Sequence, residues 1–340
     1  MYSPTSRPAD SRTGKRNRRA LMASMAVAPL ILAGCGANDG EYPSDSIEYI
    51  VPYNPGGGAD PVGRQFVQML ETELDANGNV INVPGGDEAV GITQLANADA
   101  DGYTLGLGTS GGFVAQPLVT GEAQYETPAD FTPLAKMSGT PYGLFVSPDS
   151  EYETLDDLIE AAKQNPGDIQ ISTPARMGNP AFVIYFLEEQ ADIEVSLVTT
   201  AGGTGEAALE VMSGRLDAVV GNASGQLGLV ESGDLRALAY SGPEDYSDFL
   251  PDAVRFDEAG YEIPFTSDYM TMAPAGLDED VASALREASD AIVTSEEWEE
   301  WARGQGTLPH VATGEELDTY LEDIKAGIEH GIELGNNREN

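Results

Sequence analysis

Segments rich in glycine, hydroxyl and amide side chains recur along the chain, and they hold most of the residues that could bind a ligand. The first is residues 53–60 (YNPGGGAD), between a predicted strand at 47–52 and a predicted helix at 61–74. Consecutive glycines permit positive φ and a close backbone approach, and a helix start adds unpaired N–H groups. This pattern is typical of a cradle for a small anion. The alternative is a tight turn without a ligand.

Two charged residues accompany this segment. Asp60 is positioned to cap the helix at 61–74 with its carboxylate. Arg64 lies one turn further on, and we expect it to pair with Asp60 or Glu71.

The chain offers few residues for catalysis or metal binding. It has one cysteine, Cys35, and two histidines, His310 and His330, which are not spaced as a ligand pair. We expect His310 in a loop and His330 on a helix surface. A Ser-His-Asp or Cys-His enzyme would need one of them held beside a nucleophile. The glycine segments also lack the phosphate-binding Gly-Lys-Ser/Thr motif and the dinucleotide spacing. We therefore expect no catalytic residues, no metal and no cofactor.

The formal net charge is −40, from 17 basic and 57 acidic residues in 340. Nucleic acid is a poor partner for such a surface, because phosphate binding needs clustered Lys and Arg. At about 1 M salt the screening length falls to about 3 Å, which makes such self-repulsion tolerable. The acidic composition therefore favours a halophilic protein over the weaker alternative, an ordinary acidic protein.

The N-terminus resembles an export signal. Basic residues at 16–19 (RNRR) precede an apolar run at 20–33, which is short for a membrane span of about 20 residues. Residues 32–35 (LAGC) have the form of a lipobox, so we expect lipidation of Cys35. We interpret residues 1–34 as the signal and 35–44 as a tether. Both Sec and twin-arginine export fit these residues.

Alternating strand and helix patterns follow and predict α/β units with mostly parallel sheets. Two similar units, one inserted into the other, predict two lobes with glycine-rich loops facing a cleft. We place the first lobe at 45–143 and 264–340, and the inserted lobe at 144–263. Predicted strands lie at 47–52, 79–83, 103–108, 131–137, 142–146, 169–172, 194–198, 216–221 and 236–240, with an extended run at 262–273; the main predicted helices lie at 61–74, 154–164, 180–190, 205–213, 278–294, 296–304 and 314–335.

Several segments, taken in order, resemble the solute receptors of tripartite tricarboxylate transporters, often called the Bug family. They are 42–43 (YP), 50–60 (IVPYNPGGGAD), 101–105 (DGYTL), 108–110 (GTS), 213–218 (SGRLDA), 235–239 (LRALA) and 273–276 (APAG). The resemblance covers about 43–335. It implies a two-lobe periplasmic-binding-protein fold of type II and a carboxylate held largely by the first two loops, often through waters. It also implies delivery of the ligand to separate permease subunits in the membrane.

The resemblance leads us to expect that N–H and hydroxyl groups of the first lobe bind one carboxylate of the ligand. We expect the inserted lobe to contact the rest of the ligand. The candidate ligand-binding residues are Tyr53, Asn54, Gly56, Gly57, Gly58, Asp60, Thr109, Ser110, Thr173, Arg176, Gly203, Thr204 and Asn222.

Three segments depart from the family's pattern. One is residues 200–203 (TAGG), which stand where the family has Pro-Tyr-Lys-Gly. Residues 84–89 (PGGDEA) carry acids where the family has Pro-Gly-Ala-Gly-Gly-Asn, and these acids disfavour a tightly held anionic group at that loop. The segment 173–179 (TPARMGN) places Arg176 on a cleft loop. Arg176 could pair bidentately with a distal carboxylate, or be a surface arginine beside a neighbouring acid.

We therefore predict a monomeric receptor for a small di- or tricarboxylate, lipid-anchored at the outer face of the cytoplasmic membrane. One alternative is a ligand-sensing lipoprotein that signals to a membrane kinase. A second is a hydrolase, which the scarcity of histidine and the lack of a metal cluster disfavour.

Overall fold

The computed structural model describes residues 42–121, 123–200 and 203–338. The predicted export signal and Cys35 lie outside these residues. The described strands are β1 (Ile47–Val51), β2 (Gly78–Asn82), β3 (Thr104–Thr109), β4 (Phe131–Val146), β5 (Gln170–Thr173), β6 (Ser196–Thr199), β7 (Ala218–Asn222), β8 (Arg236–Tyr240), β9 (Val254–Arg255) and β10 (Thr266–Pro274). The described helices are α1 (Ala59–Leu74), α2 (Ala89–Ala96), α3 (Gln116–Thr120), α4 (Leu155–Gln164), α5 (Asn179–Ala191), α6 (Gly203–Met212), α7 (Leu227–Glu231), α8 (Glu279–Val293), α9 (Glu296–Gly304) and α10 (Gly314–Arg338), with short turns η1 (Gly111–Ala115), η2 (Ser224–Gln226) and η3 (Glu244–Asp248).

The first lobe is built on β1, β2 and β3, which run parallel with β1 in the middle. In register, Ile50 of β1 lies between Ile81 of β2 and Gly106 of β3. β1 is buried along almost its whole length, as expected for a strand covered by helices on both faces. Because the strands are parallel, the three loops that follow them lie at one edge of the sheet.

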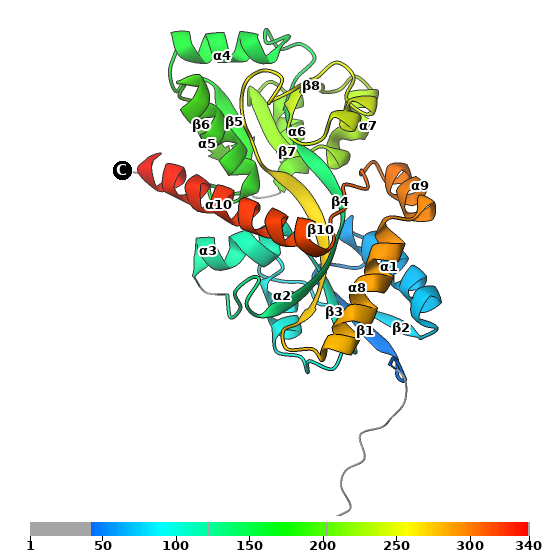
Figure 1. Ribbon diagram of the computed structural model, residues 1–340. Coiled ribbons are helices and arrows are strands. Elements are labelled where there is room, and N and C mark those ends of the chain that lie inside the picture. Colours follow the sequence, from blue (N-terminus) through cyan, green and yellow to red (C-terminus); the bar gives the residue numbers. More distant parts are fainter. Residues whose placement is uncertain (1–41, 122, 201–202, 339–340) are drawn as a thin grey trace, which may run out of the picture. The chain divides into compact units, whose positions relative to one another are not determined.

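β4 and β10 run antiparallel to each other and connect the two lobes (Figure 1). β4 pairs with β10 through Pro141, and from Tyr142 onward it pairs with β7 and β8. The second lobe continues with β7, β5 and β6 in a parallel arrangement. The prediction of separate strands at 131–137 and 142–146 is wrong, because β10 supplies hydrogen-bond partners across the intervening residues. Bulges in that pairing accommodate the irregular sequence there.

Helices α1 and α8 pack together in the first lobe, and Trp298 of α9 is fully buried beside them. The indole N–H donates to the carbonyl oxygen of Met137 at 2.7 Å, so the tryptophan ties α9 to β4. Its ring centroid lies 5.1 Å from that of Trp301. The two tryptophans therefore pack against each other.

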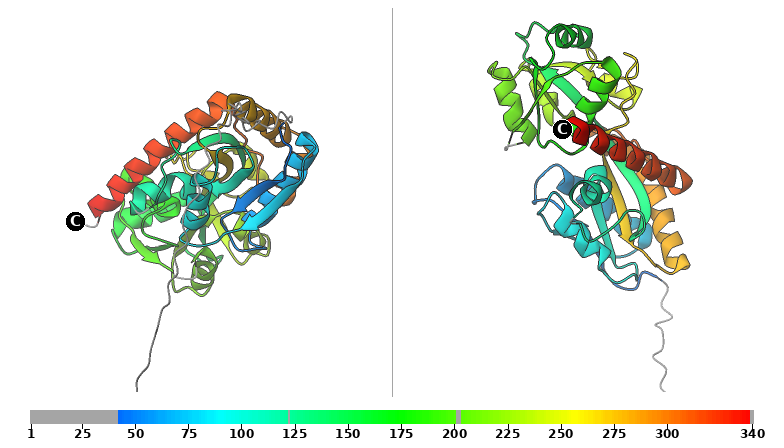
Figure 2. Two further views of the ribbon diagram at one scale, coloured as in Figure 1. Left: turned by 90° about the horizontal axis from the view of Figure 1, so that it is seen from below. Right: turned by 90° about the vertical axis from the view of Figure 1, so that its left-hand side faces the viewer.

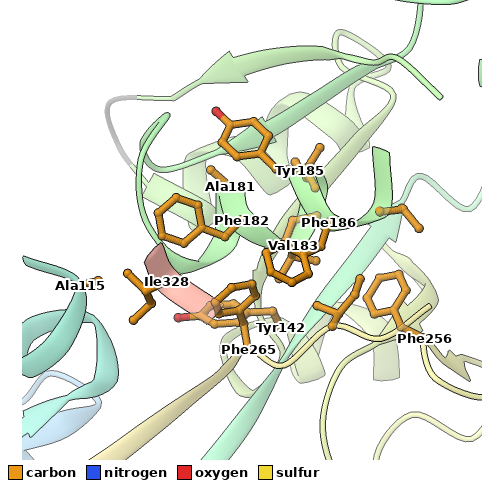
Figure 3. Close-up of a cluster of buried hydrophobic side chains, with 14 of the residues drawn as sticks. Ala115, Tyr142, Ala181, Phe182, Val183, Tyr185, Phe186, Phe256, Phe265 and Ile328 are labelled. Atoms are coloured by element: carbon orange, nitrogen blue, oxygen red, sulfur yellow. The ribbon is translucent and has the colours of Figure 1, made fainter. Parts of the chain in front are cut away.

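Helix α10 is 25 residues long and packs against α5 of the second lobe as well as β4 and η1 (Figure 2). Figure 3 shows Ile328 of α10 near Phe182 of α5 and Phe265. A side chain at Gly331 would lie 2.6 Å from the Phe182 ring, so only glycine permits this close packing. Among the described helices, none combines the length and apolar character needed to cross a membrane.

Candidate functional site

A cavity of about 510 Å³ lies where the loops after β1, β2 and β3 meet the β5–α5 loop and the start of α6. Its lining is polar and tyrosine-containing, and none of the described lining residues is Lys, Arg or His. The residues that line it are Tyr53, Asp87, Glu88, Thr109, Gly111, Gly112, Ala115, Gln116, Val119, Tyr142, Pro174, Ala175, Met177, Gly178, Asn179, Pro180, Gly203 and Ser267.

The loop between β1 and α1 is held by its own carboxylate. The Gly56 N–H and the Arg64 Nε both donate to Asp60 Oδ2, at 2.9 and 3.0 Å. Asn82 donates to Asp60 Oδ1 at 2.9 Å. The predicted pairing of Arg64 with Asp60 is confirmed, and the predicted capping role of Asp60 is wrong, because Gly58 is the N-cap residue and Asp60 lies inside the helix.

These contacts shift the acidity of Asp60. Burial alone would raise its pKa, but the hydrogen bonds from Arg64, Gly56 and Asn82 and the charge of Arg64 lower the pKa to about 2. Asp60 is therefore a stable anion that already uses one N–H group of the glycine loop.

The loop between β2 and α2 has an unusual backbone. Gly85, Gly86, Asp87 and Glu88 all have positive φ, at 133°, 57°, 46° and 75°. For the two acidic residues this left-handed conformation costs on the order of 1–2 kcal/mol each. The strained turn ends at Glu88, the residue before α2, whose side chain is buried in the cavity wall.

Glu88 binds the end of β3. Thr109 donates its backbone N–H to Glu88 Oε2 at 2.7 Å and its hydroxyl to Oε1 at 2.5 Å. The Gly112 N–H in turn donates to the Thr109 hydroxyl at 3.1 Å. A β-carbon at Gly112 would lie 2.4 Å from Glu88 Oε2, so glycine is required for this approach. An internal carboxylate thus occupies a donor-rich corner of the cavity.

Burial raises the pKa of the Glu88 carboxyl, and hydrogen bonds from Thr109 and Tyr53 oppose that shift. Burial, followed by the charge of Glu88, also raises the pKa of the Tyr53 hydroxyl. The same two causes raise the pKa of Tyr269 to about 12. Both tyrosines therefore remain neutral near Glu88.

The β5–α5 loop supplies the second lobe's side of the cavity. Thr173 is fully buried, and its hydroxyl donates to the carbonyl oxygen of Ala175 at 2.8 Å, so it shapes the loop from beneath. Arg176 is exposed and is not among the lining residues, although Ala175 and Met177 on either side are. Its carbonyl oxygen accepts a hydrogen bond from Tyr185 at 2.7 Å.

Asn179 connects the two lobes at the base of the cavity. Its Nδ2 donates to the hydroxyl of Ser110 at 3.2 Å, and that hydroxyl donates to the carbonyl oxygen of Thr266 at 3.2 Å. Asn179 is 2% exposed, yet its Oδ1 has no hydrogen-bond partner among the described residues. A buried acceptor without a donor is unusual and costs free energy.

Two predicted residues of the second lobe serve its own packing. Thr204 lies against Gly221, where an added β-carbon would meet the Thr204 methyl at 2.0 Å. Asn222 accepts hydrogen bonds from the Thr140 hydroxyl at 3.2 Å and from the Ser224 hydroxyl at 2.7 Å. Both side chains lie outside the cavity lining.

The cavity therefore brings together three of the predicted residues, Tyr53, Thr109 and Gly203. It also uses Glu88 and Asn179, which the prediction did not include. The acids at 87–88 were visible as a departure from the family's pattern, whereas only the fold places Asn179 beside Ser110. The predicted residues that do not line the cavity are Asn54, Gly56, Gly57, Gly58, Asp60, Ser110, Thr173, Arg176, Thr204 and Asn222.

A second cavity, of about 470 Å³, adjoins a buried charge cluster on β4 and β10. Lys136 is 3% exposed, and its Nζ lies 3.4 Å from Asp268 Oδ1, 3.1 Å from His310 Nδ1 and 4.2 Å from the Tyr320 ring centroid. Asp268 Oδ2 accepts hydrogen bonds from the hydroxyls of Thr266 and Tyr320, both at 2.5 Å. Lys136, His310 and Tyr320 also line this cavity. We assign the cluster a structural role, because its charged groups are paired with each other.

Two lobes joined by shared strands, with loops at the sheet edges around a cavity, define the periplasmic-binding-protein class. The model of the tripartite tricarboxylate transporter family receptor matches residues 62–327, and the chain belongs to this family. Its members are solute-binding receptors rather than enzymes.

Known proteins are similar to this chain in sequence and in fold. The chain is 28% identical over 288 residues to the protein BugT of Bordetella pertussis, which covers 83% of this chain and 86% of BugT. A TctC solute-binding protein from Polaromonas has a similar structure, with a TM-score of 0.74 at 24% identity over 86% of this chain and 99% of that one. A protein of R. palustris solved with adipate has a TM-score of 0.73 at 21% identity over 87% and 99%.

Proposed function

We propose that this chain is an exported receptor that captures a small organic acid and delivers it to the membrane subunits of a tripartite transporter. The family match over 62–327 carries the proposal. The convergence of loops from both lobes on one cavity supports it, since a receptor of this fold closes on its ligand about a hinge. The similarity to a protein solved with adipate supports a carboxylate-bearing ligand.

We infer that the first lobe spans 45–143 and 264–340 and the second spans 144–263. β4 changes its strand partners between Pro141 and Tyr142, within a few residues of the proposed boundary at 143–144. This change of partners supports the division. By this division helix α10 belongs to the first lobe and packs on α5 of the second lobe. The second lobe would therefore move against α10 when the two lobes close.

The exposed guanidinium of Arg176 is proposed to pair with a distal carboxylate of the ligand at the rim of the cavity. Its neighbours Ala175 and Met177 line the cavity, so a long side chain between them can reach the opening. Arg176→Ala should weaken binding by about tenfold, or about 1.4 kcal/mol, as expected for one charge-assisted contact. Arg215→Ala, on the exposed pair with Glu210, is the control and should leave affinity unchanged.

The remaining candidate residues outside the cavity lining are proposed to act on the ligand indirectly. Asp60 would order the loop at 53–58, and Ser110 and Thr173 would hold the two faces of the closed site through the contacts described above. Thr204 and Asn222 would fix the second lobe's loops.

We further propose that the receptor is a monomer held at the outer face of the cytoplasmic membrane by lipid on Cys35. Expression with a labelled fatty acid tests the anchor, because Cys35→Ser should lose the label and release the protein from the membrane fraction. A labelled Cys35→Ser protein would contradict it.

Calorimetric titration of the purified chain with a panel of small organic acids, in about 1 M salt to screen the net charge, tests the receptor function. We expect one class of acid to bind and to raise the melting temperature. Uptake of that acid by cells lacking the chain distinguishes transport, where uptake is lost, from sensing, where uptake persists. No binding across the panel would refute the proposal.

A further inference from the structure

The cavity at the candidate site carries negative charge. Asp87 and Glu88 line it, and among the described lining residues no Lys, Arg or His balances them. Glu88 is only 7% exposed, so its charge is poorly screened by water. A ligand carboxylate placed beside it would add a second negative charge to the same buried corner.

Hydrogen-bond donors in this corner are already engaged by Glu88 and Thr109. The N–H and hydroxyl groups of Thr109 bind Glu88, and the Gly112 N–H binds the Thr109 hydroxyl. These are donors that a ligand carboxylate would need. An anionic ligand group therefore finds few free partners there, and it would have to displace Glu88.

The acceptors, in contrast, are available. A carboxylate offers about four lone-pair positions; Thr109 uses two of those on Glu88 and Tyr53 uses a third, so a position remains for a ligand donor. Asn179 Oδ1 is buried without a donor. The amide orientation is determined by its neighbours, because the Ser110 hydroxyl donates to Thr266 and can only accept from Asn179 Nδ2. A ligand N–H at this end of the cavity would supply the donor that Oδ1 lacks.

From this arrangement we propose that the ligand carries an ammonium group which binds Glu88, so that its class is an amino acid rather than a plain organic acid. Tyr53 and Tyr142 also line the cavity, and aromatic rings favour a cation over an anion. This inference rests on the proposed receptor function, and it specifies what that receptor selects.

Pairs of ligands that differ by one ammonium group test the inference: succinate with aspartate, glutarate with glutamate, and adipate with 2-aminoadipate. Calorimetric titration of the full chain gives the affinity ratio within each pair. We expect the amino member of at least one pair to bind at least about tenfold more tightly. Glu88→Gln keeps the side-chain size and should reduce that ratio to less than about threefold by weakening the amino acid. Glu160→Gln removes one charge from the exposed face of α4 and should leave the ratio unchanged.

The possible failures are distinguishable. If the plain acid binds as tightly as the amino acid in the unaltered chain, the inference is overturned and the receptor function stands. If the ratio is unchanged in Glu88→Gln, the assignment to Glu88 is overturned. If neither member of any pair binds, and no other acid does, the receptor function fails as well. Even if Glu88→Gln does not fold, the affinity ratio within each ligand pair, measured on the unaltered chain, tests whether the ligand is an amino acid.

Discussion

Replacing Lys136 with methionine should destabilise the fold strongly, because it leaves Asp268 buried without its cation. Lys136 is 3% exposed and Asp268 is fully buried, with 3.4 Å between Nζ and Oδ1. At that distance, with an effective dielectric constant of about 20, the Coulomb attraction is about 5 kcal/mol. Removing one partner of a buried pair costs about 3–5 kcal/mol, and we expect a loss in this range for Lys136→Met.

The loss can be converted to a melting temperature. An unfolding entropy of about 2.1 cal/mol/K per residue over roughly 300 residues is about 0.6 kcal/mol/K, so a loss of about 4 kcal/mol lowers the midpoint by about 6 °C. Calorimetric melting and urea titration in about 1 M salt would measure it, and salt should not abolish the effect because a buried pair is weakly screened.

A double-mutant cycle separates the ion pair from simple loss of packing. Asp268→Asn keeps an acceptor for Thr266 and Tyr320, so Lys136→Met with Asp268→Asn should recover at least half of the lost stability. Lys163→Met on the exposed surface of α4 is the control and should change stability by less than about 0.5 kcal/mol. A loss below about 1 kcal/mol for Lys136→Met, or strictly additive effects in the cycle, would refute this reasoning.

Three further outcomes are expected. Asp60→Asn should be less stable than the unaltered chain near neutral pH, because a carboxylate whose pKa is lowered from 3.8 to about 2 stabilises the fold above that range. The difference in unfolding free energy between the two proteins should narrow as pH falls through about 2. A difference that stays the same when stability is measured down to that pH would contradict this role of Asp60. Burial, followed by the charge of Lys136, lowers the pKa of His310, so the fold binds a proton less readily than the unfolded chain and stability should fall as pH decreases below 6.5. His310→Gln should remove part of this dependence; His330→Gln, at a half-buried residue in contact with Glu189, serves as the comparison. With a net charge of −40, the melting temperature should rise with salt up to about 1 M, and a melting temperature independent of salt would contradict the proposed halophilic character.

Much of the architecture could be predicted from the sequence, because local patterns control it. The strand at 47–52 and the helix at 61–74 follow from apolar periodicity, and their structural counterparts are β1 and α1. The continuity of β4 could not be predicted, since the partner that bridges its irregular middle is β10, more than a hundred residues away.

The candidate site divides in the same way. The sequence by itself determined that glycine-rich loops follow successive parallel strands, and hence that Tyr53 and Thr109 would lie near each other at one sheet edge. The sequence also showed acidic residues at 87–88, but not which way their side chains point. Only the tertiary structure decided that the left-handed turn at Asp87 and Glu88 buries a carboxylate against Thr109.

The assignment of donors is likewise a tertiary property. A glycine loop presents N–H groups, but whether a ligand or a protein carboxylate uses them depends on which side chains fold back onto it. Here Asp60 binds Gly56 and Glu88 binds Thr109, across short and long separations in the chain. The sequence determined a loop-lined receptor of the α/β class, and the turn that places Asp87 and Glu88 in the cavity wall decided the charge that the ligand meets.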